Sequence, residues 1–173
     1  RINEAGIGYT LRASSGTLTP AESAPFAVVA GTASRLTLAT QPSAAATSGV
    51  PLAVQPTIQI RDAGGNAVAQ AGVQVTVALE GAGAALGGTS SVTTNAEGVA
   101  AFAGLVITGS AGTYTLLFAA PGLIAIASNG IVIGAGEIFG GGIAPAIAGG
   151  IAQKFGIQYT LYFAMGGQLL GIL

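Results

Sequence analysis

Two segments of the sequence match each other without gaps at an offset of 105 residues, and this internal repeat constrains the fold more than any other feature. The matched positions share a tyrosine, two leucines, a serine and an Ala-Gly pair: Tyr9, Leu11, Leu18, Ser23 and Ala30-Gly31 fall on Tyr114, Leu116, Leu123, Ser128 and Ala135-Gly136. A repeat at fixed spacing is typical of chains built from copies of one structural unit. We therefore predict that residues 1–31 are the end of one unit and that residues 32–136 are a complete following unit.

Residues 32–136 carry a succession of short strand patterns separated by Gly, Pro, Asn and Ser. We predict strands at residues 34–38, 54–61, 73–77, 91–94, 99–107, 113–119, 124–127 and 130–133. In the second of these, Ile58 and Ile60 fall on one face and Gln59 on the other. The glycine-rich stretch 81–88 predicts a flexible loop. About seven to nine short strands in a unit of about 105 residues indicate an immunoglobulin-like β-sandwich, and no window shows the period of a helix.

Four stretches of this unit carry a family resemblance. They are Ile58-Gln59-Ile60-Arg61-Asp62 with Gly64-Gly65-Asn66, Val73 to Val77, Thr94 to Phe102, and Gly112 to Leu116. On these stretches, residues 1–136 resemble bacterial immunoglobulin-like repeats of the kind found in surface adhesins of the invasin and intimin type. The resemblance implies a non-catalytic spacer or adhesive module outside the cell, although a fold alone does not fix a function.

Residues 1–31 hold only the last strands of a sandwich. On their own they would expose sheet edges and an apolar face to water. The sequence leaves two interpretations open. Either these residues belong to a longer array of units, or they pair with a neighbouring subunit by strand addition, which produces a filament when the contact does not close into a ring.

The composition changes at Glu137. Residues 137–173 contain one acid and one base, and residues 156–173 form an uncharged stretch of 18 residues. That length is at the lower limit for a helix that spans a bilayer. The stretches 139–146 and 153–156 resemble the last membrane hairpin of a major-facilitator transporter, and no transport activity follows from so short a resemblance.

The same tail also fits a strand. Residues 156–161 (GIQYTL) echo residues 6–11 (GIGYTL), and periodicity cannot assign so short an apolar run. We predict a helical anchor, with a strand or strand donor as the open alternative. In either form the tail is too apolar to be left in water, so it is expected to face lipid, a partner subunit or the sandwich.

The composition excludes several kinds of chemistry. The chain is 51% hydrophobic and only 6% charged, and it contains no cysteine and no histidine. Disulfides, thiolate zinc sites and Cys or His nucleophiles are therefore excluded, and five basic residues give no electrostatic footprint for nucleic acid. We predict no enzymatic activity, no cofactor and no metal. The pair Arg61-Asp62 is expected to cap a turn rather than bind a ligand, and Tyr9 and Tyr114 are expected at structural corners.

These observations predict a structural protein outside the cell or on its surface. The first hypothesis is a subunit of an extracellular bacterial fibre or filament, assembled from copies of itself by strand pairing and burial of the apolar tail. The alternative is a surface adhesin or stalk module anchored in a membrane through residues 137–173. Low charge favours association because it provides little repulsion between copies. The residues expected to carry assembly are Tyr9, Leu11, Phe26, Ile157, Tyr159, Leu161 and Phe163.

Overall fold

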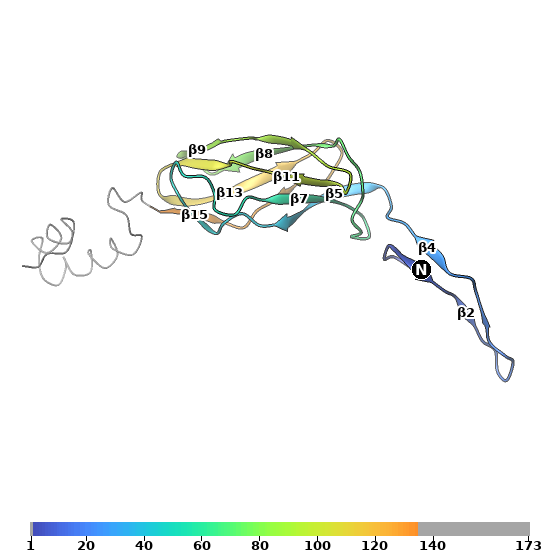
Figure 1. The fold of residues 1–173 in the computed structure, drawn as a ribbon. Helices are drawn as coiled ribbons and strands as arrows, with labels where there is room; N and C mark the ends of the chain where they lie inside the picture. The colour runs from blue at the N-terminus through green and yellow to red at the C-terminus, as the bar shows by residue number, and fades with distance from the viewer. Residues whose placement is uncertain (1, 135–173) are drawn as a thin grey trace, which may run out of the picture. The chain divides into compact units, whose positions relative to one another are not determined.

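The computed structural model describes residues 2–134, which form antiparallel strands joined by turns, without a helix (Figure 1). One sheet has the strand order β11-β7-β5 and consists of β5 (Ala33–Thr40), β7 (Thr57–Asp62) and β11 (Val99–Ala101). A second sheet has the order β10-β8-β13-β15-β6, with β14 pairing with β13. Its strands are β6 (Ala45–Thr47), β8 (Gln74–Glu80), β10 (Ser91–Thr93), β13 (Gly112–Ala119), β14 (Ile126–Ala127) and β15 (Ile131–Gly134). A shorter pair joins β9 (Ala84–Gly87) to β12 (Val106–Gly109).

The two larger sheets enclose one apolar core between them (Figure 1). The buried core side chains from their strands are Leu36, Ile58, Ile60 and Ala100 on one sheet, and Val75, Val77, Tyr114, Leu116, Phe118, Ile131 and Ile133 on the other. The rings of Phe102 and Phe118 pack with centroids 5.3 Å apart, a separation typical of aromatic pairs. The predicted mainly β, immunoglobulin-like sandwich is confirmed. The predicted apolar tail, residues 137–173, lies outside the described residues.

Two local predictions were wrong. The single strand predicted over residues 99–107 is divided into β11 and β12, with Gly104 between them at a φ of 68°. The predicted flexible loop over residues 81–88 contains β9, which pairs with β12 in a register that places Leu86 opposite Ile107. Alanine and glycine give no alternating hydrophobic signal, and the partner strand is distant in sequence, so the local pattern could not reveal this pairing.

Tyr114 forms the corner that the repeat predicts. Its side chain is buried, and its hydroxyl donates a hydrogen bond to the carbonyl oxygen of Ser110 at 2.9 Å. A tyrosine whose hydroxyl returns to the backbone a few residues upstream is a recurrent feature of immunoglobulin-like sandwiches. The hydroxyl of Tyr9 likewise donates to the carbonyl oxygen of Glu4 at 3.1 Å. The structural role predicted for both tyrosines is therefore confirmed.

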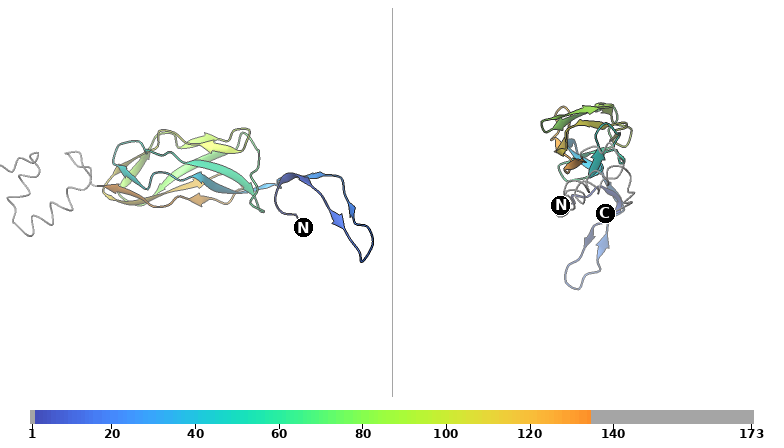
Figure 2. Two further views of the ribbon diagram at one scale, coloured as in Figure 1. Left: turned by 60° about the horizontal axis from the view of Figure 1, so that its bottom comes forward. Right: turned by 90° about the vertical axis from the view of Figure 1, so that its left-hand side faces the viewer.

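The N-terminal segment forms a two-stranded hairpin, blue in Figure 2, whose register matches that of β13 with β14 and β15 except for a shift of one residue at Gly6. It consists of β1 (Gly6–Tyr9), β2 (Arg12–Ala13), β3 (Ala21–Glu22) and β4 (Phe26–Val28). β1 pairs with β4 and places Tyr9 opposite Phe26, whereas β13 pairs with β15 and places Tyr114 opposite Ile131. β2 pairs with β3 just as the following part of β13 pairs with β14. We call residues 6–28 the N-terminal hairpin.

Truncating the equivalent leucines of the two segments should have very different effects on the free energy of unfolding of the sandwich. Leu116→Ala removes a fully buried side chain and should cost about 2–5 kcal/mol. Leu11→Ala should change that free energy by less than about 0.5 kcal/mol, because Leu11 is 61% exposed. Chemical denaturation followed by circular dichroism measures both values. Equal losses would mean that the hairpin and the sandwich share one core, contrary to this description.

Candidate unit-junction site

The turn that follows β7 closes on itself through its own backbone. The N–H of Asp62 donates to the carbonyl oxygen of Asn66 at 3.0 Å, and the N–H of Gly65 donates to the carbonyl oxygen of Asp62 at 3.1 Å. Gly65 has a φ of 93°, which side-chain-bearing residues rarely adopt. The Asp62–Asn66 turn is therefore a defined structure, consistent with the turn chemistry that the sequence indicates.

The Asp62 carboxylate is saturated with hydrogen bonds. Oδ1 accepts from the backbone N–H of Asn66 at 2.8 Å, and Oδ2 accepts from the side-chain amide of Asn66 at 2.9 Å. Oδ2 also accepts from the backbone N–H of Gly31 at 2.8 Å, which lies on the linker between β4 and β5. Since these donors favour the charged form, the side-chain amide of Asn66 above all and then the N–H of Gly31, they lower the pKa of Asp62 from 3.8 to about 2.

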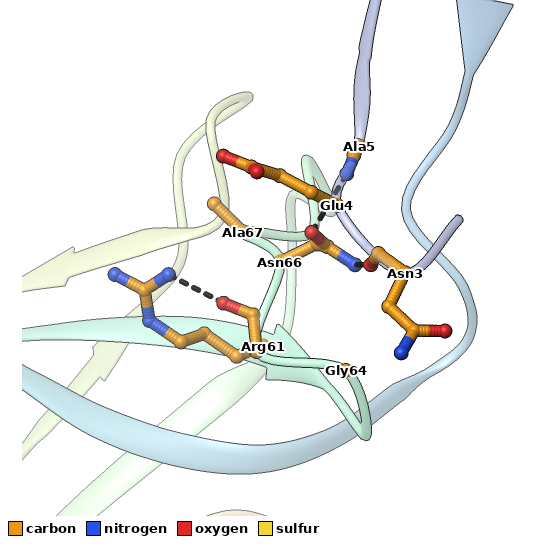
Figure 3. Close-up of a pocket in the computed structure, with 8 residues that line it drawn as sticks. Asn3, Glu4, Ala5, Arg61, Gly64, Asn66 and Ala67 are labelled. Atoms are coloured by element: carbon orange, nitrogen blue, oxygen red, sulfur yellow. Dashed lines mark hydrogen bonds between the residues drawn. The ribbon is translucent and has the colours of Figure 1, made fainter. Parts of the chain in front are cut away.

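The Asn66 side chain connects the turn to the chain segment that leads into the N-terminal hairpin (Figure 3). Its Nδ2 donates to the carbonyl oxygen of Asn3 at 2.8 Å, and its Oδ1 accepts from the backbone N–H of Ala5 at 2.8 Å. Gly64 permits this approach, because a Cβ there would lie only 3.2 Å from the same Asn3 oxygen. The Asp62–Asn66 turn thus bonds both to the segment that enters the hairpin and to the linker that leaves it.

Arg61 supports the turn from β7, the strand that runs into it. Its Nη1 donates to the carbonyl oxygen of Gly65 at 2.7 Å, and its Nε donates to Oγ1 of Thr37 at 3.0 Å. The prediction that Arg61 and Asp62 cap a turn is confirmed by these contacts. Beside them lies a hollow of about 590 Å³, lined by Asn3, Glu4, Ala5, Arg61, Gly64, Gly65, Asn66 and Ala67 (Figure 3).

The hollow offers no metal-binding set. Within residues 2–134, no three His, Cys, Asp or Glu side chains lie close enough together to hold a metal ion. The side chain of Asn66, which lines the hollow, is already paired with Asp62 and with the backbone of Asn3 and Ala5. Chemically, this arrangement recognises peptide N–H and C=O groups and joins two segments of chain.

The residues predicted to carry assembly fall into two groups. Tyr9, Leu11 and Phe26 lie on the N-terminal hairpin, where the rings of Tyr9 and Phe26 have centroids 6.2 Å apart and both side chains are half-buried. Leu11 is 61% and Leu18 is 70% exposed. The other predicted residues, Ile157, Tyr159, Leu161 and Phe163, lie outside the described part of the chain. A role in assembly stays a prediction for both groups.

Sequence reasoning identified the turn and missed what it contacts. The local pattern shows Asp62 and Asn66 around two glycines, which is turn chemistry, and carries no information about which distant backbone groups the side chains meet. One signal was available. Gly31 recurs as Gly136 in the repeat, and a glycine kept at the end of each unit indicates a close backbone approach there.

Comparison with known proteins leaves the family open. No family model and no curated protein matches the chain, so the resemblance of the tail to a transporter is unsupported. Among solved structures, the Escherichia coli adhesin FdeC is 22% identical, with a TM-score of 0.44 over 76% of this chain and 41% of its own. A glycosyl hydrolase family 2 member from Bacteroides cellulosilyticus is 18% identical, with a TM-score of 0.46 over 65% of this chain and 16% of its own. The chain therefore spans less than half the length of either structure, and likenesses of this size assign it no activity, ligand or location.

No helix of residues 2–134 is long and apolar enough to cross a membrane.

Acid should weaken the Asp62–Asn66 turn in a defined pH window. Because the pKa of Asp62 is lowered from 3.8 to about 2, its charged form contributes stability above pH 3.8, and that contribution is lost as the pH falls toward 2. Asp62→Asn removes this titration. The difference in free energy of unfolding between the natural chain and Asp62→Asn should therefore narrow across this window in denaturation measured at several pH values. A difference that stays constant with pH would contradict the role given to the Asp62 carboxylate.

Proposed function

We propose that this chain is a non-enzymatic spacer from a tandem array of immunoglobulin-like units on the surface of a bacterial cell. It would supply one complete unit, together with the closing strands of the unit before it. The observation that supports this proposal most is that the N-terminal hairpin repeats the pairing of β13 with β14 and, at Tyr9 and Phe26, the pairing of β13 with β15. The bacterial surface setting rests on the resemblance to invasin-type and intimin-type repeats.

The repeated pattern extends to individual side chains. Oγ of Ser23 accepts from the N–H of Leu11 at 2.9 Å and donates to the next carbonyl oxygen at 2.9 Å. In the complete unit, Oγ of Ser128 accepts from the N–H of Leu116 at 3.0 Å and donates to the next carbonyl oxygen at 2.8 Å. Local strand propensity does not predict that two segments share the same side-chain hydrogen bonds, whereas repetition of one structural unit does predict it.

The hairpin also has unfilled positions where the complete unit has partners. In the complete unit, residues 115–119 pair with β8, and Leu116 is fully buried. The matching residues 10–14 have no strand on that side among residues 2–134, and Leu11 is 61% exposed. An isolated hairpin is marginally stable in water. The missing partner would be a strand equivalent to β8, with the sheet that faces it, supplied by the preceding unit.

A second candidate function is the fibre subunit, and the exposed leucines of the hairpin favour it. In that case another copy of the chain would cover Leu11 and Leu18. Within the described residues, however, the position that such a strand would take in a second copy is already filled, because β13 lies between β8 and β15. The array is therefore the better supported function. A fibre would require an opened sandwich, pairing at an edge strand such as β10 or β11, or a strand from residues 137–173.

A hybrid chain tests the array. Residues 32–111 of this chain are placed directly before residue 7, so that the hairpin can close a unit made of this chain's own strands. The array predicts that the added residues fold with the hairpin, giving a second cooperative unfolding transition and an added length of one unit in small-angle scattering. If the added residues stay unfolded while residues 32–134 remain folded, the hairpin is not the closing part of such a unit.

Side-chain size needs a matched control in the hybrid. Ala13 takes the place of Phe118, and Phe26 takes the place of Ile131, so the hybrid core could fail from poor packing alone. The double variant Ala13→Phe/Phe26→Ile restores the side chains of the complete unit at these two positions. This variant should fold at least as stably as the unmodified hybrid. Failure of both hybrids would overturn the proposal.

Sedimentation separates the array from the fibre. A chain ending at residue 136 should be monomeric at micromolar concentration, because β13 already fills the position that a donated hairpin strand would take in its sandwich. Concentration-dependent fibres would support the second candidate instead. The double variant Leu11→Asp/Leu18→Asp is the control: it abolishes association through the apolar face and spares association through another surface.

A further inference from the structure

We propose that the Asp62–Asn66 turn is an inter-unit lock that binds the backbone of the preceding unit and fixes it against the sandwich. This inference rests on the proposed function, in which residues 1–31 belong to that preceding unit. The lock has two contact points. Asp62 holds the linker after β4 at Gly31, and Asn66 holds the segment before β1 at Asn3 and Ala5.

Two contact points restrict motion more than one. A single bond from Asp62 to the linker at Gly31 would leave the preceding unit free to swing about that point. The bonds from Asn66 hold the chain before β1, which is the other chain end of the hairpin. One turn therefore holds both chain ends. The turn itself is stiffened by the bonds between Asp62 and Asn66 and by the bond from Arg61 to Gly65.

The partner that fits this lock is defined by backbone rather than by side chains. The groups it bonds are the N–H of Gly31, the N–H of Ala5 and the carbonyl oxygen of Asn3. The one side-chain requirement is smallness at position 31, where a Cβ would lie 3.3 Å from Oδ2 of Asp62. The lock should therefore accept units of varied sequence that end in glycine, and the repeat keeps that glycine as Gly136.

A metal or small-ligand role for the same residues fits less well. Both oxygens of Asp62 accept hydrogen bonds from within the protein, and the side chain of Asn66 uses its oxygen once and its nitrogen twice. Charged residues beside the turn include Arg61, Arg35 and Glu4. Arg61 is occupied by Gly65 and Thr37, and Glu4 lines the hollow.

Amide hydrogen exchange in the intact chain tests the lock directly. The N–H groups of Ala5 and Gly31 should be protected in the natural chain. Asn66→Ala should raise exchange at Ala5 by about fivefold or more, as expected for loss of a hydrogen bond at a local opening, and leave Leu116 in the core unchanged. Unprotected Ala5 and Gly31 in the natural chain, or an unchanged Ala5 in Asn66→Ala, would overturn the proposal.

Asn95→Ala is the matched control. Asn95 also sits in a turn of the sandwich, where its Oδ1 accepts from the N–H groups of Glu97 and Val99 at 3.1 and 2.9 Å. Exchange should rise at those two amides and stay unchanged at Ala5 and Gly31. If Asn66→Ala unfolds the sandwich, Gly64→Ala replaces it, because the added Cβ would lie 3.1 Å from Nδ2 of Asn66 and 3.2 Å from the carbonyl oxygen of Asn3, which crowds their contact without removing either lock side chain.

Spin labels measure the fixed placement that the lock would give. The chain contains no cysteine, so Ala27→Cys and Ser90→Cys place one label on β4 and one on an exposed residue of the sandwich. The distance distribution should be narrow in the otherwise natural chain and broad with Asn66→Ala. A broad distribution in both would refute the lock. These measurements use the chain without any added unit, so their failure is distinct from failure of the hybrid chain.

Discussion

The structure depends on covering the inner face of β13. Tyr114, Leu116 and Phe118 alternate along this strand, all of them buried, and β8 and β15 flank it in the sheet. Burying a single large apolar side chain is worth about 1.5–3 kcal/mol, so the strand gains its stability only when the facing sheet is present. With 6% charged residues, the chain has little else to keep such a face soluble. Each closing strand pair therefore needs the rest of a sandwich.

The same constraint applies to the N-terminal hairpin. It has the register of the closing strands and their tyrosine corner, and it lacks the facing sheet among the described residues. In the proposed array of tandem units, the facing sheet would belong to the same polypeptide. Each unit would then bury the apolar face of its closing strands and make one polar contact with its neighbour. The polar contact uses backbone groups, so it can persist while the side chains of successive units diverge.

Much of the sandwich could be predicted from the sequence, for physical reasons that differ from element to element. The spacing of Val75 and Val77 predicts β8, because buried and exposed side chains alternate with a period of two in a half-buried strand. β9 escaped prediction, since Ala84–Gly87 has no such period and depends on a distant partner. Gln59 falls on the strand face opposite Ile58 and Ile60, yet its side chain is also buried, because the turn that contains Glu97 and Gly98 covers it and accepts its hydrogen bonds at 3.1 and 3.3 Å.

The candidate site was predicted only in part. The glycines and the Asp-Asn spacing indicate a turn, but the contacts from Asn66 to Asn3 and Ala5 span more than 60 positions and have no local signature. Long-range contacts of this kind are fixed by the whole fold rather than by neighbouring residues. The aromatic and aliphatic residues predicted to carry assembly were selected from the repeat and from strand alternation, which find the exposed Leu11 and carry no information about the backbone contacts of the Asp62–Asn66 turn.

The most direct test of the central claim is the thiol reactivity of Leu11→Cys, because the chain has no other cysteine. The labelling rate is compared between the chain as it stands and the same chain carrying residues 32–111 before residue 7. The account predicts fast labelling in the first and labelling at least about tenfold slower in the second, as burial under a facing sheet requires opening before reaction. Equal, fast labelling in both would contradict the claim that this hairpin closes an immunoglobulin-like unit.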